Sequence, residues 1–116
     1  MAKLVALMKL RPDISLDAAR GMYENEHVPL VLSLMPMVRE YRRNYLTRSA
    51  SSSVGWPDFD VITELWFDSI PRLESFVQQM RQGEAGRRLR ADSARFLVPG
   101  TTRMFVVDER GLGGRR

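Results

Sequence analysis

The sequence predicts an α+β fold built on one four-stranded sheet, and three observations favour it. Four stretches with strand character are separated by stretches in which apolar residues recur at helical spacing. Two of the four, residues 3–10 and 59–67, are apolar on both alternating faces, which is typical of central strands. The length of 116 residues suits one hydrophobic core, so we expect a single domain over residues 1–109.

The first strand is predicted over residues 3–10, and the RPDIS sequence that follows it breaks the strand. Ser15 is suited to cap a helix, with Asp17 in the first turn. The helix should end before Pro36. Its apolar stripe at helical spacing consists of Leu16, Ala19, Tyr23, Leu30 and Leu34.

The middle of the chain predicts two strands joined by a long loop. Residues 37–46 alternate imperfectly and include charged side chains, which suits a strand at a sheet edge or beside a subunit partner. Residues 47–58 are rich in Ser and Gly, and a loop of this length is commonly a lid or disordered. Residues 59–67 are β-branched and aromatic on both faces and predict a second central strand.

The last part of the chain predicts two helices and a strand. Residues 68–80 have Asp68 or Ser69 as a cap and apolar residues at helical spacing. A second helix is expected over 84–97, and a final strand over 101–109 after a Pro-Gly turn. The glycine- and arginine-rich residues 110–116 have nothing to bury and are expected to be a disordered tail.

The resulting order β-α-β-β-α-α-β is a ferredoxin-like βαββαβ pattern in which two helices share the second crossover. The helices of such a fold cover one face of the sheet. Because the strands are apolar on both sides, the other face should be an association surface. We therefore expect a homodimer.

Composition excludes several classes of function. Only two of the 18 basic residues are lysines, and the basic residues are scattered among 14 acidic ones, so the net charge of +4 does not indicate a nucleic-acid partner. The opening MAKLVALMKL is too short to span a membrane, and we expect a cytoplasmic protein without a membrane partner. The absence of cysteine and the single histidine leave no metal-site spacing, so neither a metal nor a cofactor is expected.

His27, the only histidine, lies on the apolar stripe of the first predicted helix. At about 100° per residue it falls within about 20° of Leu16, and it therefore faces the core side. Two residues later Pro29 lacks an N–H and would clash with the carbonyl of Asn25. The helix should kink there and open space beside His27.

Asp92 lies on the apolar stripe of a later helix, seven residues after Ala85 and four before Phe96. A carboxylate on a core face is costly unless it is paired. Since both helices should cover the same sheet face, His27 and Asp92 are expected to line one cavity. Glu64 is a further inward candidate, but its strand is apolar on both faces and its direction stays open.

A neutral imidazole oriented by a carboxylate is suited to general acid/base catalysis near neutral pH. A structural interpretation also stays open, in which His27 forms a hydrogen bond at the kink and Asp92 ties two helices together. Five aromatic residues are suited either to stack on a planar ligand or to pack in the core or an interface: Tyr23, Tyr41, Tyr45, Trp56 and Trp66.

Four stretches resemble the ethyl tert-butyl ether degradation (EthD) family of the dimeric α+β barrel superfamily. They are MYENEHVPLV, YRRNYL, FDVITELWFDS and ADSARFLVPGTTRMFVVDE. The most specific pieces are His27, Pro29 and Leu30, the ELWF sequence, and the spacing from Asp92 to Phe96.

The resemblance implies a ferredoxin-like subunit whose sheet packs against a second copy, with a pocket between sheet and helices. It implies that His27 is the pocket histidine and Asp92 the recurrent acidic residue before the last strand, so both are expected to be catalytic. The residues expected to contact a substrate are Tyr23, Leu30, Glu64, Trp66 and Phe96.

Relatives of this kind imply more than one chemistry. The first interpretation is a small cofactor-independent enzyme, a dehydratase, decarboxylase or cyclase, acting on a hydrophobic aromatic or polyketide-like cyclic substrate. The alternatives are a cofactor-free monooxygenase, an accessory protein of a P450-type oxidative system, and a non-catalytic binder of an aromatic metabolite. The sequence leaves the substrate and the reaction type open.

Overall fold

The computed structural model describes residues 1–47, 55–111 and 113. Within these ranges the element order is β-α-β-β-α-α-β, as predicted, with the first helix divided by a π-helical turn, η1. The elements are β1 (Ala2–Met8), α1 (Leu16–Met22), η1 (Tyr23–His27), α2 (Val28–Leu34), β2 (Glu40–Tyr45), β3 (Val61–Phe67), α3 (Ile70–Gln82), α4 (Glu84–Ser93) and β4 (Arg103–Val107).

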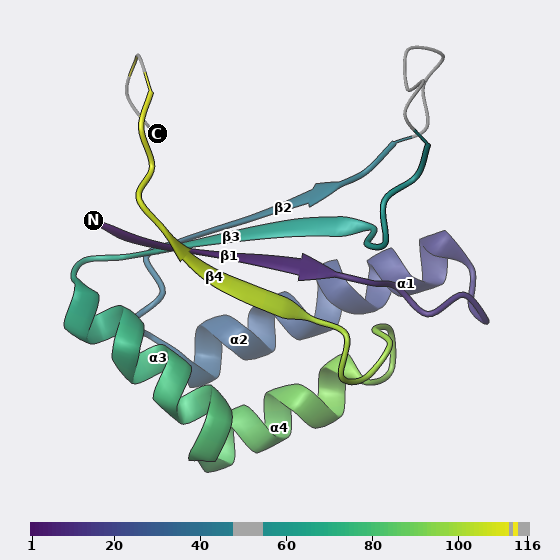
Figure 1. Ribbon diagram of the computed structural model, residues 1–116. Helices are drawn as coiled ribbons and strands as arrows, with labels where there is room; N and C mark the ends of the chain where they lie inside the picture. The colour runs from purple at the N-terminus through teal and green to yellow at the C-terminus, as the bar shows by residue number, and fades with distance from the viewer. Residues whose placement is uncertain (48–54, 112, 114–116) are drawn as a thin grey trace.

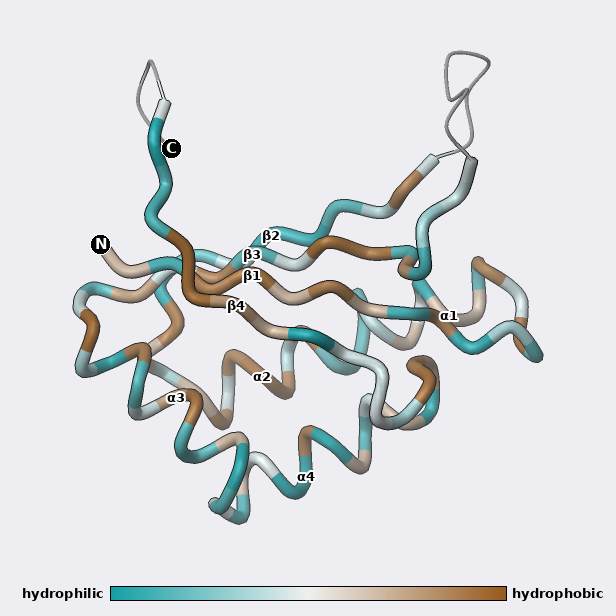
Figure 2. Tube along the Cα trace, viewed as in Figure 1, coloured by the Kyte–Doolittle hydropathy of each residue, from teal (hydrophilic) through white to brown (hydrophobic). Residues whose placement is uncertain are grey.

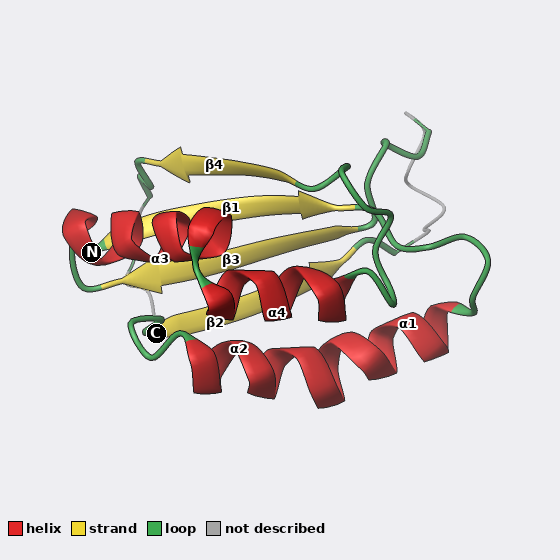
Figure 3. Ribbon diagram, turned by 90° about the horizontal axis from the view of Figure 1, so that it is seen from below, coloured by secondary structure: helices red, strands yellow, loops and turns green. Residues whose placement is uncertain are grey.

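The four strands form one antiparallel sheet in the order β2-β3-β1-β4. This order confirms that β1 and β3 are the central strands and that β2 lies at an edge. The helices all lie on one side of the sheet (Figure 1). A view from that side shows α3 and α4 in front of the strands and α1 and α2 running alongside β2 (Figure 3). The architecture is the predicted ferredoxin-like α+β fold.

Strand alternation decides which residues reach the core. Leu4 and Ala6 of β1 face the helices and are almost fully buried, as are Thr63 and Leu65 of β3. The residues between them point to the opposite face, where Val5 stands between Glu64 and Phe105 in the register. Hydrophobic segments are visible along the strands, including the end of β4 (Figure 2).

The core consists of two clusters of buried side chains. One lies beneath α2, α3 and α4 and includes Phe67, Leu73 and Leu89. The other lies beneath α1 and η1 and includes Tyr23 and Phe96. The second cluster is the one that surrounds His27.

Helix ends follow the predicted caps, with one exception. The Oγ of Ser15 accepts a hydrogen bond of 3.0 Å from the N–H of Ala18, and Ser69 rather than Asp68 caps α3. The helix predicted over residues 84–97 ends earlier, at Ser93, because Leu97 pairs with Leu10 in an isolated bridge. That pairing draws the chain back toward the sheet before the last strand.

Two sequence predictions fall largely outside the described residues. The Ser-rich loop was predicted over 47–58, and residues 48–54 are not described. In the predicted tail, residue 112 and residues 114–116 are likewise outside the description. Among the described residues, no helix combines the length and the apolar character needed to cross a membrane.

Replacing Gly86 with alanine should lower the free energy of unfolding by roughly 1–3 kcal/mol. A Cβ at this position would overlap the carbonyl oxygen of Gln79 and the Cα of Met80, so α3 and α4 approach too closely for any side chain. Gly21→Ala is the matched control, since a Cβ there meets only Asn25 at 3.9 Å and alanine favours helix. Urea unfolding of both variants measures the two changes in the free energy of unfolding. Equal changes would contradict a close contact of α3 and α4 at Gly86.

Candidate active site

The turn that carries His27 is π-helical. Along η1 the chain widens, and the N–H of Val28 donates to the carbonyl of Tyr23, five residues back. Pro29 explains the widening, because it has no N–H to give and its ring would clash with the carbonyl of Asn25 in a regular helix. The predicted loosening is therefore present, and such turns occur frequently at functional sites.

His27 and Asp92 meet between η1 and α4. The Nδ1 of His27 lies 2.8 Å from the Oδ2 of Asp92, and only 6% of His27 is exposed. The imidazole also packs edge-on against two aromatic rings, with centroid distances of 5.6 Å to Tyr23 and 5.1 Å to Phe96. The structure thus brings together the two residues that helical periodicity placed on facing stripes.

Asp92 is held from its other side by an arginine. The Nε and Nη2 of Arg95 donate to the Oδ1 of Asp92 at 3.0 and 2.7 Å. Arg95 also forms an ion pair of 3.1 Å with Glu26, in the turn that carries His27. Arg95 therefore keeps the carboxylate ionised and leaves Oδ2 to the histidine.

The two pKa values define the protonation of the pair near neutral pH. Burial lowers the pKa of His27, and the hydrogen bond and charge of Asp92 oppose this only in part. Burial acts to raise the pKa of Asp92, but the hydrogen bonds from His27 and Arg95 outweigh it and hold that pKa below its usual range. An ionised Asp92 next to a neutral imidazole requires the proton on Nδ1.

The second ring nitrogen of His27, Nε2, carries no proton in this state and has a free lone pair. Within residues 1–47, 55–111 and 113, Nε2 of His27 has no hydrogen-bond partner. Every buried side-chain nitrogen or oxygen in the same residues does have a partner, so Nε2 is not sealed from solvent. Nε2 is the atom through which His27 can exchange a proton with another molecule.

Tyr23 is a fixed neutral phenol beside the histidine. Its hydroxyl lies 2.7 Å from the Oγ1 of Thr63 and 3.0 Å from the hydroxyl of Tyr41, and its ring stacks on Phe96 at 5.0 Å. Burial raises the pKa of Tyr23 to about 12 despite these hydrogen bonds. Tyr23 and Phe96 therefore contact His27 and fill the space beside it, and their expected contact with a substrate stays a prediction.

Three other predicted substrate contacts do not join this group. Glu64 and Trp66 point to the sheet face opposite the helices, where Glu64 pairs with Lys3 at 2.8 Å. Leu30 packs against the cluster beneath α2 and α3. Strand alternation places Glu64 and Trp66 on the same outer face. The direction of Glu64, which the sequence left open, is therefore away from His27.

A pocket at the end of the sheet does not include the His27–Asp92 pair. A pocket of about 620 Å³ opens at the end of the sheet, and neither His27 nor Asp92 lines it. Tyr45 lines this pocket and contacts Tyr23 on its inner side, with ring centroids 6.4 Å apart. Tyr23 therefore stands between this pocket and His27, and this pocket is not the chamber that His27 and Asp92 were expected to share.

Two residues that sequence reasoning missed are Arg95 and Thr63. Asp92 and Arg95 both lie in the helix predicted over residues 84–97, and their spacing of three residues was the available signal for Arg95. Thr63 lies on the buried face of β3, but no feature of the sequence indicated its hydrogen bond to Tyr23. Within the described ranges, no group of three or more His, Cys, Asp or Glu residues is placed to hold a metal ion.

The fold and the site together define a ferredoxin-like α+β protein with a buried His–Asp pair between its helices. The family model described as EthD domain matches residues 11–100, and this chain belongs to the EthD family. No curated protein matches the sequence significantly.

Solved structures agree with this assignment. An EthD family protein from Bacillus halodurans is 26% identical with a TM-score of 0.65, and the match covers 95% of this chain and 99% of that one. A hydroxynitrile lyase from Passiflora edulis has a TM-score of 0.65 at 9% identity, over 95% of each chain. A dimeric protein of ferredoxin-like fold from Bacteroides fragilis has a TM-score of 0.59 at 10% identity, over 93% of this chain and 95% of that one. The last two show the shared fold alone.

Proposed function

We propose that this chain is an enzyme in which His27 acts as a general acid/base on a hydrophobic cyclic substrate. The observation that carries the proposal is the contact of 2.8 Å between Nδ1 of His27 and Oδ2 of Asp92, with Nε2 left unpaired in the described part of the chain. Proton removal and return at one position suits dehydration, decarboxylation or cyclisation.

Each member of the site has a distinct role in this scheme. Nε2 takes a proton from the substrate, and the imidazolium that forms is stabilised by the ionised Asp92. Arg95 orients Asp92 through two hydrogen bonds. The same nitrogen then returns the proton to the product or the leaving group. The rings of Tyr23 and Phe96 lower the local polarity, which strengthens these electrostatic interactions.

The reaction class is supported only indirectly by relatives. The neighbour from Passiflora edulis is a hydroxynitrile lyase. A single proton-transferring group such as His27 is compatible with a lyase reaction. The identity of 9% to this neighbour carries the fold and not the substrate. We therefore propose a lyase or cyclase as the class and leave the substrate to experiment.

We also propose that the chain forms a homodimer through the outer face of its sheet. Phe105 on this face is 47% exposed, and Val5, Leu7 and Ile62 lie beside it in the register. Neighbouring apolar side chains on an open sheet face favour an interface, here beside the ion pair of Lys3 and Glu64. The structural neighbour from Bacteroides fragilis is itself dimeric.

A second function is favoured by the separation between the pocket and His27. Binding of an aromatic metabolite without turnover needs only the pocket, and Tyr23 blocks the route from it to the imidazole. In that case the His27–Asp92 pair would tie η1 to α4.

Turnover by the His27→Asn variant separates the two functions. The substrate is first identified by mass spectrometry of small molecules that co-purify with the protein, and product is then followed by chromatography. An acid/base role predicts a loss of turnover of about 100-fold or more with ligand binding kept. Ser33→Ala, an exposed change on α2, is the control. Unchanged turnover by the variant would contradict the role of His27, and binding without product by the wild type would favour the second function.

A further inference from the structure

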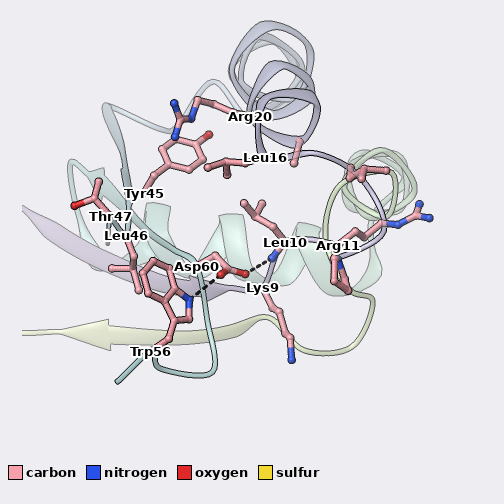
Figure 4. A pocket seen from close by; sticks show the side chains of 13 residues that line it. Lys9, Leu10, Arg11, Leu16, Arg20, Tyr45, Leu46, Thr47, Trp56 and Asp60 are labelled. Atoms are coloured by element: carbon pink, nitrogen blue, oxygen red, sulfur yellow. Dashed lines mark hydrogen bonds between the residues drawn. The ribbon is translucent and has the colours of Figure 1, made fainter. Parts of the chain in front are cut away.

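The pocket at the end of the sheet has the properties of a site for a flat, apolar molecule. Its volume of about 620 Å³ lies within the range of small-molecule sites. Figure 4 shows the side chains of Leu10, Leu16, Tyr45 and Leu46 around the space, with Trp56 at its lower rim. Leu16 is 52% exposed and Trp56 37% exposed, although both are large and apolar. Exposed apolar side chains gathered around one hollow mark a binding site more often than scattered ones do.

Most polar groups on the pocket wall are already engaged. The carboxylate of Asp60 accepts hydrogen bonds from the N–H of Leu10 at 2.9 Å and from the indole N–H of Trp56 at 3.1 Å. Lys9 forms an ion pair with Asp58, and Arg11 forms one with Asp13. These contacts hold the wall in place and engage both carboxylate oxygens of Asp60 in hydrogen bonds.

Arg20 differs from the other cations of the pocket. Its guanidinium lies over the ring of Tyr45, 4.8 Å from the centroid. It forms no ion pair with a carboxylate in the described part of the chain, although its charge contributes to lowering the pKa of Glu24. Figure 4 shows it beside Tyr45 at the upper rim. The N–H groups of a guanidinium point outward in the plane of the guanidinium. When the guanidinium lies over an aromatic ring, these groups can still donate to an anion.

Tyr45 is itself a rigid platform. Its hydroxyl donates to the Oε2 of Glu24 at 2.7 Å, and Glu24 is held in turn by Arg43 through Nε and Nη2 at 3.0 and 2.6 Å. Burial, followed by the hydrogen bond and charge of Glu24, raises the pKa of Tyr45, so the phenol stays neutral. Arg20 therefore rests on a fixed surface at the edge of an apolar hollow.

We propose that this pocket binds a planar apolar molecule with one anionic group, the ring lying among Leu10, Leu16, Leu46 and Trp56 and the anion on Arg20. The inference deepens the second function proposed above, because it specifies the class of ligand that the pocket takes. It does not require His27, which lies behind Tyr23.

The test compares two ligands of the same shape, 2-naphthoate and 2-naphthamide, at pH 7.5. Binding is followed by NMR on the indole N–H signals of Trp56 and Trp66, which a Trp66→Phe variant assigns. Wild-type protein should bind the anion about 3- to 10-fold more tightly than the amide, and the shift should occur at Trp56. Arg20→Gln should abolish this preference, whereas Arg72→Gln, an exposed arginine of α3 outside the pocket, should keep it.

A further variant separates the parts of the proposal. Leu16→Ser should weaken the binding of both ligands to the same extent, since Leu16 contributes only apolar surface. Only binding is measured and no turnover, which keeps this test independent of the acid/base role of His27. Equal affinity for the two ligands, a preference that survives Arg20→Gln, a shift at Trp66 alone, or no binding at millimolar concentration would each overturn the proposal.

Discussion

Replacing Phe96 with alanine should lower the free energy of unfolding by about 3–5 kcal/mol. Phe96 is fully buried and lies at the centre of the cluster beneath η1, stacked on Tyr23 and in edge contact with His27. Its removal leaves a void between helix and sheet that these rigid rings cannot fill. Chemical denaturation at one protein concentration measures the loss.

The same variant should also move the pKa of His27 back toward its ordinary value. Burial is the main cause of the lowered pKa, and a void at Phe96 admits water to the ring. Phe96→Leu should give a smaller effect on both quantities, and Ile70→Ala, at a residue 52% exposed on α3, should leave the pKa unchanged. A stability loss below about 1 kcal/mol for Phe96→Ala would show that this cluster is not a core.

The fold was largely predictable because its elements are locally consistent. The apolar character of both faces of residues 3–10 and 59–67 identified the central strands. Ser15 and Ser69, predicted as helix caps, are the N-cap residues of α1 and α3. The end of α4 was not predictable, because the pairing of Leu97 with Leu10 is a contact between distant parts of the chain. No local pattern encodes such a contact.

The candidate site was predictable in one part only. Helical periodicity placed His27 and Asp92 on inward faces, and the antiparallel order of the sheet brought those faces together. The position of the cavity was not predictable, because it depends on volume: Tyr23 and Phe96 occupy the space beside the imidazole. Glu64 shows the limit of strand patterns, since a strand with two apolar faces does not reveal which one the helices cover.

Replacing Asp92 with asparagine should lower the pKa of His27 further, because the neighbouring charge that opposes the effect of burial is lost. The amide keeps the size of the side chain but carries no charge to stabilise the imidazolium, while the burial that lowers this pKa remains. Because His27 is the only histidine, one imidazole signal in an NMR titration reports the change. Asp17→Asn, an exposed residue of α1, makes the same charge change without touching His27.

Stability should follow from the same shift. The pKa of His27 is lower in the folded chain than in the unfolded one, so the unfolded chain binds more protons as pH falls below about 6.5, and the stability present above that pH is lost. In Asp92→Asn the pKa of His27 in the folded chain is lower still. The pH range over which stability falls therefore extends to lower pH, and the free energy of unfolding decreases more between pH 7 and pH 5. His27→Gln, which removes the titrating group, should abolish this component. A histidine pKa that rises or stays constant in Asp92→Asn would show that the carboxylate does not stabilise the imidazolium, and the acid/base role of the pair would fall with it.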